Sequence, residues 1–178
     1  MKETLLLLYL GGSSIWDWRT GRIPNRWQLC WAGILGLEAL WPPWTAGAEG
    51  PLTRLGAYAA GALLCLLLFF PFYLFRMFGA GDIKTVSLLC GAAGVLPGLG
   101  AVLCGLGASA LWSFFRMARK RLFKKRVTYF FNYLKRLPGA EGIPAYYVPA
   151  RDGAEPAFCM VPFLFLGFCL WMAKGGAI

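Results

Sequence analysis

An uncharged run of 21 residues, 55–75, constrains this chain more than any other feature of its sequence. At about 1.5 Å per residue, a helix of that length crosses a hydrocarbon layer of about 30 Å. The chain of 178 residues is 58% hydrophobic and 15% charged, and its charges gather in a few clusters between apolar segments. A soluble domain of this size needs a more polar surface than that. The sequence therefore predicts an integral membrane protein.

Apolar segments of this kind recur along the chain and should all be helical, because lipid offers no hydrogen-bond partner to irregular backbone. They lie at 4–16, 27–44, 55–75, 83–97, 99–115 and 157–173. The first is short for a full span. The fourth is short and glycine-rich, and we expect it to be half-buried among its neighbours. Pairs of small residues at helix-packing spacing, such as Gly56 and Ala60 or Gly105 and Ser109, favour close helix contacts. The predicted fold is an all-α membrane protein, a polytopic bundle of about six transmembrane helices that forms one domain over residues 1–178.

The basic residues predict how this bundle is oriented. With the loops 17–26, 76–84 and 116–156 in the cytoplasm, 15 of the 18 Lys and Arg residues are cytoplasmic and both termini lie outside. The prediction is a multi-pass protein of the plasma (inner) membrane. The basic loop at about 116–156 should contact lipid headgroups. The net charge of +10 does not indicate nucleic-acid binding, because the cations lie between apolar segments.

The histidine and cysteine content excludes several kinds of site. The chain has no histidine, and its six cysteines form no C-x-x-C pair. A zinc site and a histidine-based triad are therefore not expected, and no metal or other cofactor is predicted. The cysteines lie inside or beside apolar segments, where buried, inert thiols are expected.

Three carboxylates, Asp17, Glu38 and Asp82, lie within or at the edge of apolar segments, where a charge is costly and usually functional. Glu38 lies near the outer end of its segment, within reach of the headgroups. Asp17 follows the first segment and Asp82 opens the fourth, so both reach the same membrane depth. Two carboxylates at close range share a proton and can activate water and protonate a leaving amine. Alternatively, Asp17 caps a turn and Asp82 is the N-cap of the fourth helix.

The residues around these aspartates favour the first interpretation. Gly79 and Gly81 flank one small residue just before Asp82, which leaves bare backbone that a peptide substrate can approach and pair with. An Ile-Pro-Asn turn at 23–25 follows Asp17, and its fixed proline sets how the second segment leaves the loop.

The G-x-G-D sequence at 79–82, followed by Lys84, and the D-x5-I-P-N sequence at 17–25 resemble the two signatures of type IV prepilin peptidases. The segment 161–167 is similar to the proline-phenylalanine stretch in the last helix of that family. The resemblance implies an aspartic endopeptidase that removes the short basic leader from prepilin-like or pseudopilin substrates at the cytoplasmic face, without a cofactor. It assigns Asp17 and Asp82 as the catalytic aspartates and Gly79 and Gly81 to the substrate site.

The sequence departs from the longer members of that family in two respects. It lacks the N-terminal cytoplasmic domain with paired C-x-x-C sequences, so methyltransferase activity is not implied. Its basic loop is longer than expected, and its charge should repel a basic leader. Two alternatives stay open: a preflagellin peptidase, and a non-enzymatic membrane assembly factor or carrier that uses the two aspartates structurally or for ions. A structural cap would not need the bare G-x-G backbone.

Overall fold

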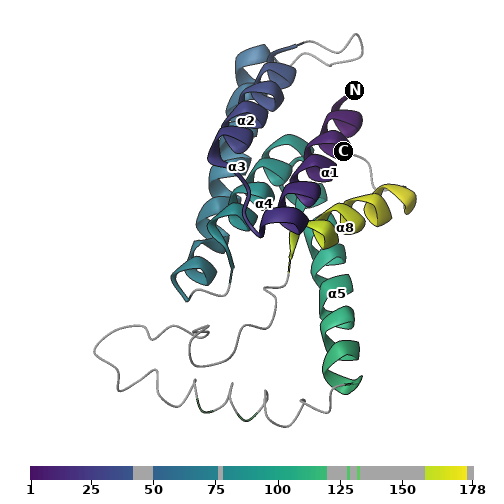
Figure 1. Ribbon diagram of the computed structural model, residues 1–178. Coiled ribbons are helices and arrows are strands. Elements are labelled where there is room, and N and C mark those ends of the chain that lie inside the picture. Colours follow the sequence, from purple (N-terminus) through teal and green to yellow (C-terminus); the bar gives the residue numbers. More distant parts are fainter. Residues whose placement is uncertain (42–49, 76–77, 120–127, 129–131, 133–158, 176–178) are drawn as a thin grey trace.

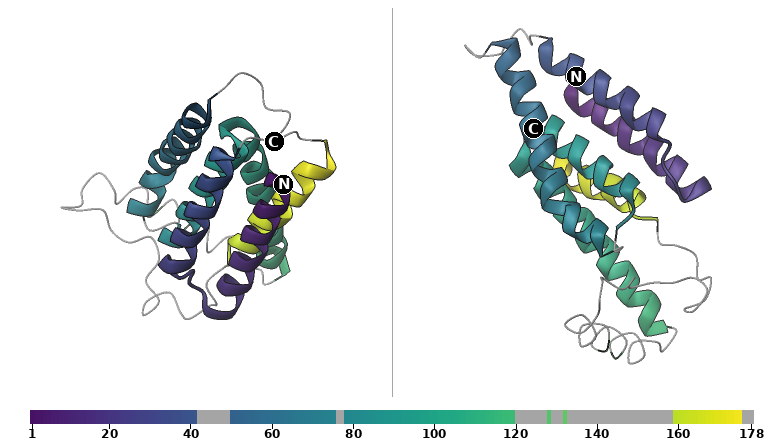
Figure 2. Two further views of the ribbon diagram at one scale, coloured as in Figure 1. Left: turned by 90° about the horizontal axis from the view of Figure 1, so that it is seen from above. Right: turned by 90° about the vertical axis from the view of Figure 1, so that its left-hand side faces the viewer.

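The computed structural model describes residues 1–41, 50–75, 78–119, 128, 132 and 159–175 (Figure 1). These residues form six helices and contain no strand, which confirms the all-helical prediction for this part of the chain. The helices are α1 (Lys2–Thr20), α2 (Asn25–Leu40), α3 (Pro51–Leu74), α4 (Ala80–Ala93), α5 (Val95–Arg119) and α8 (Val161–Ala173). Figure 2 shows α1 and α2 side by side and antiparallel, as their short connecting turn requires.

Each helix coincides with one predicted apolar segment, but several ends differ. Helix α4 begins one turn earlier than expected and ends at Gly94, whose φ of 94° is open to glycine at little cost. Helix α5 continues to Arg119, so that Arg116 and Arg119 belong to a helix and not to the basic loop predicted from residue 116. The rest of that loop lies almost entirely outside the described residues.

Helix length separates the elements into two groups. By length and composition, α3 and the part of α5 at Val95–Arg116 can cross a membrane, and α8 is a shorter apolar helix. With 14 residues, α4 is about 21 Å long, less than the roughly 30 Å of a hydrocarbon core. The six predicted spans therefore stay a prediction.

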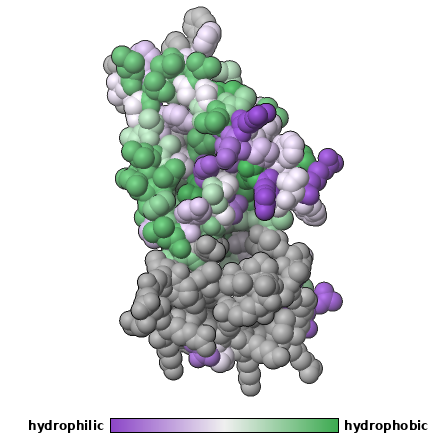
Figure 3. Space-filling view, turned by 60° about the vertical axis from the view of Figure 1, so that its left-hand side comes forward, coloured by the Kyte–Doolittle hydropathy of each residue, from purple (hydrophilic) through white to green (hydrophobic). Residues whose placement is uncertain are grey.

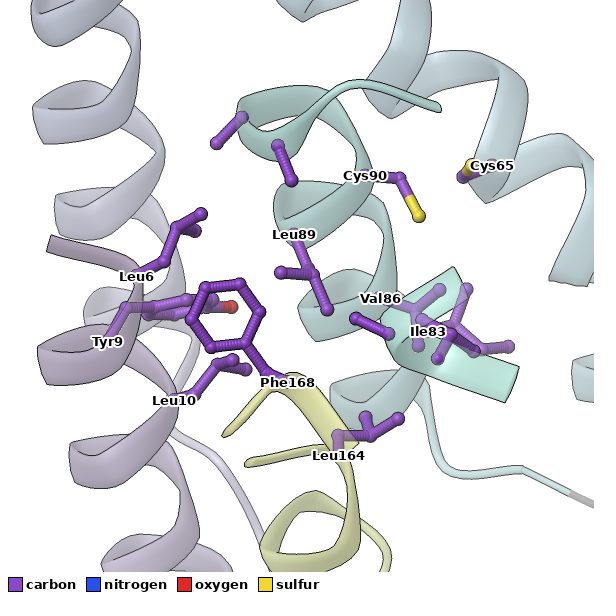
Figure 4. Packing of buried hydrophobic residues seen from close by; sticks show 14 of the residues in the cluster. Leu6, Tyr9, Leu10, Cys65, Ile83, Val86, Leu89, Cys90, Leu164 and Phe168 are labelled. Atoms are coloured by element: carbon purple, nitrogen blue, oxygen red, sulfur yellow. The ribbon is translucent and has the colours of Figure 1, made fainter. Parts of the chain in front are cut away.

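Helix α4 lies at the centre of the bundle, where it contacts α1, α2, α3 and α5. Nine of its 14 residues are buried, in agreement with the expectation that the fourth segment is half-buried among its neighbours. Val86 and Leu89 of α4 pack in one cluster with Leu6 and Leu10 of α1. In Figure 4, the ring of Phe168 from α8 lies between the α1 side chains and Leu89.

The exposed face of α3 is apolar. Exposed side chains on this helix include Leu63, Leu64, Leu67, Leu68 and Phe70. Hydrophobic groups cover much of the described surface in Figure 3. An apolar surface of this extent is unusual for a soluble monomer and suits contact with lipid tails.

Close helix contacts depend on small residues, as the sequence predicts for some positions. A Cβ atom on Gly167 would overlap the backbone of Gly105, so α5 and α8 cross at these two glycines. Gly56, which has the same predicted spacing from Ala60, has open space around it, so the prediction is wrong at that position. The α5–α8 crossing brings the start of α8 to the end of α1, where the candidate site lies.

Candidate active site

Asp17 lies in the last turn of α1 and is 6% exposed. The helix ends at Gly21 in the left-handed conformation (φ 61°), whose N–H donates to the main-chain oxygen of Asp17 at 2.8 Å. The side chain does something else: its Oδ2 accepts the N–H of Val161, the first residue of α8, at 3.2 Å. The cap of α1 is thus made by backbone, and the carboxylate is tied to a helix 144 residues further along the chain.

Asp82 lies in the first turn of α4, three residues after its N-cap, which is Gly79. The alternative that Asp82 itself is the N-cap is therefore wrong in position. Its carboxylate nevertheless bonds the helix start, because the Gly79 N–H donates to Oδ2 at 3.2 Å. This bond explains why α4 begins one turn before the predicted apolar segment, since an acidic side chain at this position stabilises a helix N-terminus.

The two aspartates lie on contacting helices, and the charge of Asp17 acts on Asp82. Asp17 follows the predicted apolar segment 4–16, and Asp82 precedes the segment 83–97, so both lie outside the apolar segments. Burial, and then the charge of Asp17, raise the pKa of Asp82 from 3.8 to about 6, against the opposing Gly79 N–H bond. Burial also raises the pKa of Asp17, against the Val161 N–H bond. A negatively charged neighbour favours the protonated form of a carboxyl group, so the position of Asp17 favours a proton on Asp82.

The two sequence motifs pack against each other beside this pair. The Nζ of Lys84 donates to Oδ1 of Asn25 at 2.8 Å. The buried side chain of Ile23 covers Gly81, where a Cβ atom would lie 3.4 Å from the Ile23 Cβ. The turn at 21–25 is therefore fixed on the first turn of α4.

The two motif glycines differ from the expected bare loop. Gly81 is the second residue of α4, and among the described glycines positive φ occurs only at 21, 94 and 175. Gly79 is extended (φ −72°, ψ 149°) and exposed, whereas Gly81 is half-buried under Ile23. Accessible main chain next to Asp82 is thus found at Gly79 and Ala80.

The sequence did not predict a buried network of hydrogen bonds that joins α1, α2 and α4 near the aspartates. Gln28 on α2 is 4% exposed and its Nε2 donates to Thr85 Oγ1 at 2.9 Å and to the Gly81 carbonyl at 3.4 Å. Its Oε1 accepts the hydroxyl of Tyr9 from α1. The only sequence signal was the presence of amide and hydroxyl groups within apolar segments, where they need partners.

Cys159, just before α8, is a second neighbour that the sequence did not identify. Its Sγ donates to the main-chain oxygen of Asp17 at 3.4 Å. Burial and then the charges of Asp17 and Asp82 raise the pKa of its thiol. The expectation of uniformly buried cysteines is met by Cys65 and Cys90 but is wrong for Cys30, which is exposed.

Other candidates lie away from the pair or do not form a site. Glu38 is 13 residues beyond Asn25 on α2, about 20 Å along the helix, so it is not part of the site. Within the described part of the chain, no three His, Cys, Asp or Glu side chains are grouped so as to hold a metal ion. A cavity of about 340 Å³ adjoins the motif contact and is lined by Asn25 and Lys84 together with Leu29, Leu66 and Leu88.

A helical bundle with two carboxyl groups at the ends of neighbouring helices belongs to the class of proteins whose side chains are suited to acid–base chemistry. The model of the type IV leader peptidase family matches residues 4–115, more than half of the chain and a range that includes both aspartates. The chain belongs to this family. No curated protein and no solved structure matches it significantly. Family membership, together with the apolar helices, indicates a membrane protein with peptidase activity of the leader-peptidase type.

Proposed function

We propose that this chain is an aspartic endopeptidase that removes the short basic leader from type IV prepilin-like or pseudopilin substrates. The observation that carries the proposal is that Asp17 and Asp82, the two aspartates of the sequence motifs, lie at the ends of contacting helices, where the charge of Asp17 raises the pKa of Asp82. Two carboxyl groups in different surroundings can supply one ionised and one protonated group, which hydrolysis of an amide needs.

In the proposed reaction, the active form is the one with Asp82 protonated, and burial and the charge of Asp17 favour this form by raising the pKa of Asp82 to about 6. Asp17 is the ionised partner, and the Val161 N–H stabilises its negative charge. Asp17 takes a proton from water as the water oxygen attacks the scissile carbonyl carbon. Asp82 gives its proton to the amide nitrogen as the carbon–nitrogen bond breaks. The proton then returns from Asp17 to Asp82, and the pair is ready for another substrate.

The substrate is proposed to approach the exposed backbone next to Asp82. Gly79 has no side chain and is exposed, so an extended peptide can come close to the main chain at Gly79 and Ala80 and to the Asp82 carboxyl group beside it. Gly81 contributes to the same site by letting Ile23 pack closely on α4.

The proposed topology is a single domain of six membrane-embedded helices, with the aspartates on the cytoplasmic side of the plasma (inner) membrane. Helices α2, α4 and α8 have 16, 14 and 13 residues, fewer than the roughly 20 needed for a full span. Helices of this length leave room for water near the ends of α1 and α4, where local thinning of the bilayer accommodates them. The basic loop is proposed to bind lipid headgroups and not the leader.

The test uses the full chain reconstituted in liposomes with a synthetic prepilin precursor that carries a basic leader. Mass spectrometry should find cleavage at a single bond, and the Glu38→Gln variant should retain this activity because Glu38 is far from the pair. A folded protein that leaves the precursor intact would contradict the proposal. Ion flux across the same liposomes without cleavage would instead support the carrier alternative.

A further inference from the structure

We infer that Gln28 is a positioning residue for the carboxylate pair: through its hydrogen bonds to Tyr9, Thr85 and Gly81 it sets the spacing of the two helices that carry Asp17 and Asp82. The catalytic meaning of this inference rests on the proposed function. Its structural basis is the bridge that Gln28 of α2 forms between α1 and α4.

The residues of the bridge lie in register with the aspartates. Tyr9 and Asp17 are two turns apart on the buried face of α1, and Ser13 between them is fully buried as well. Ser13 Oγ accepts the indole N–H of Trp27, the residue before Gln28, at 3.0 Å. Helix α1 is thus joined to α2 at two successive turns above Asp17.

On α4 the bridge ends immediately beside the second carboxylate. Gly81 precedes Asp82, and Thr85 is one turn after it on the same helix. The Thr85 hydroxyl donates to the Gly81 carbonyl at 2.9 Å and accepts from the Gln28 amide at 2.9 Å. Both rotation and translation of the first turn of α4 are therefore linked to Gln28.

The amide is suited to this role because it accepts at one atom and donates at the other. Tyr9 donates to Oε1, while Nε2 donates toward α4, so one side chain has a partner on each of the two aspartate helices. These groups are almost completely buried, and in such surroundings a hydrogen bond that is lost leaves its partner without water to replace it. A hydrophobic side chain of the same size would fill the space but would not fix the helices in one register.

Catalysis by a pair of carboxylates is sensitive to their spacing, since a misplacement of about 1 Å can reduce a rate about 100-fold. The spacing also sets how strongly Asp17 affects the proton affinity of Asp82. That coupling is measurable without any substrate, as the change in the Asp82 pKa on Asp17→Asn.

The experiment compares wild type with Gln28→Met, which keeps the length of the side chain but removes its hydrogen bonds. The control is Tyr58→Phe, which removes a bond of 3.1 Å from α3 to the carbonyl of Ala32 on α2. The Asp82 carboxyl is followed by ¹³C NMR in the purified full chain, with and without Asp17→Asn. Cys159, the other titratable group affected by both aspartates, is replaced by Ser in every protein.

The expected result is that Gln28→Met lowers the coupling to less than half of its wild-type value, whereas Tyr58→Phe leaves it unchanged. With a prepilin substrate, kcat should fall at least tenfold in Gln28→Met and KM should change less than about threefold. If Gln28→Met does not fold, Thr85→Val and Tyr9→Phe each remove one end of the bridge and should reduce the coupling in the same direction.

Unchanged coupling in a folded Gln28→Met protein, or in Thr85→Val and Tyr9→Phe, would overturn the inference and leave Gln28 with a purely structural role. Because the titration needs no substrate, this outcome is independent of whether the wild-type protein cleaves prepilin. If the wild-type protein does not cleave prepilin but its coupling falls in Gln28→Met, the proposed function is contradicted and the positioning role stands.

Discussion

Substitution of Gly81 tests whether the motif glycine acts through packing or through direct contact with substrate. A Cβ atom at this position would meet Ile23 carbons at 3.4 to 3.5 Å, which is ordinary van der Waals contact. Gly81→Ala should therefore be neutral or stabilising, because it adds a buried methyl group and removes a glycine from a helix, each worth about 0.5–1 kcal/mol. Turnover should stay within about twofold of wild type.

Gly81→Val should behave differently because its two γ-methyl groups extend beyond the Cβ atom toward Ile23. Overpacking of this kind costs about 1–3 kcal/mol and displaces the Ile-Pro-Asn turn from α4. We expect a melting temperature several degrees lower and a turnover at least tenfold lower. Trimming the neighbour should relieve the overlap, so Gly81→Val combined with Ile23→Ala should recover both quantities relative to Gly81→Val alone.

The assay is the turnover of a prepilin peptide by purified protein, together with the melting temperature of each variant in the same detergent. Ile23→Ala alone is the control, since it only removes the covering side chain. A large loss of turnover in Gly81→Ala at unchanged stability would refute the packing argument and would place the substrate main chain directly against Gly81. Failure of Ile23→Ala to rescue Gly81→Val would show that the overlap is with another group.

Two further predictions concern the pH response and the membrane orientation. The raised pKa of Asp82 means that the folded protein binds a proton that the unfolded chain has released between pH 3.8 and about 6, so stability should fall as the pH rises through this window. Asp82→Asn should therefore melt above wild type at about pH 7 but not at about pH 4; equal melting at both pH values would contradict this. Cysteines introduced singly at residues 22 and 49 of a cysteine-free protein should be labelled on intact cells by an impermeant reagent at 49 and not at 22; the reverse pattern would invert the topology.

The positions of the helices and the place of each aspartate at a helix end could be predicted from the sequence because both follow from local signals. A long uncharged run is helical in lipid wherever it occurs. Asp17 and Asp82 stand at ends of apolar segments, and antiparallel connections bring such ends to one side. The flanking Ile23 and Gly81 then meet through the same arrangement.

The contacts that hold the pair in place could not be predicted, because they join helices whose relative rotation is set by packing. The sequence around Gln28 does not indicate that its amide bonds Tyr9 through one atom and Thr85 through the other. The bond from Val161 to Asp17 links residues 144 apart in sequence. The prediction that Gly81 lies in a loop was wrong because the Asp82 carboxylate bonds the Gly79 N–H and stabilises a helix start that the apolar pattern does not mark.

The central claim, that Asp17 and Asp82 act as one catalytic unit, is tested most directly by the cleavage rates of Asp17→Asn, Asp82→Asn and the double variant. All three should insert and fold like wild type, and all three should lose cleavage to the same low level, because neither carboxyl group works without the other. Near-normal cleavage by either single variant, or losses that simply multiply in the double variant, would contradict the paired mechanism.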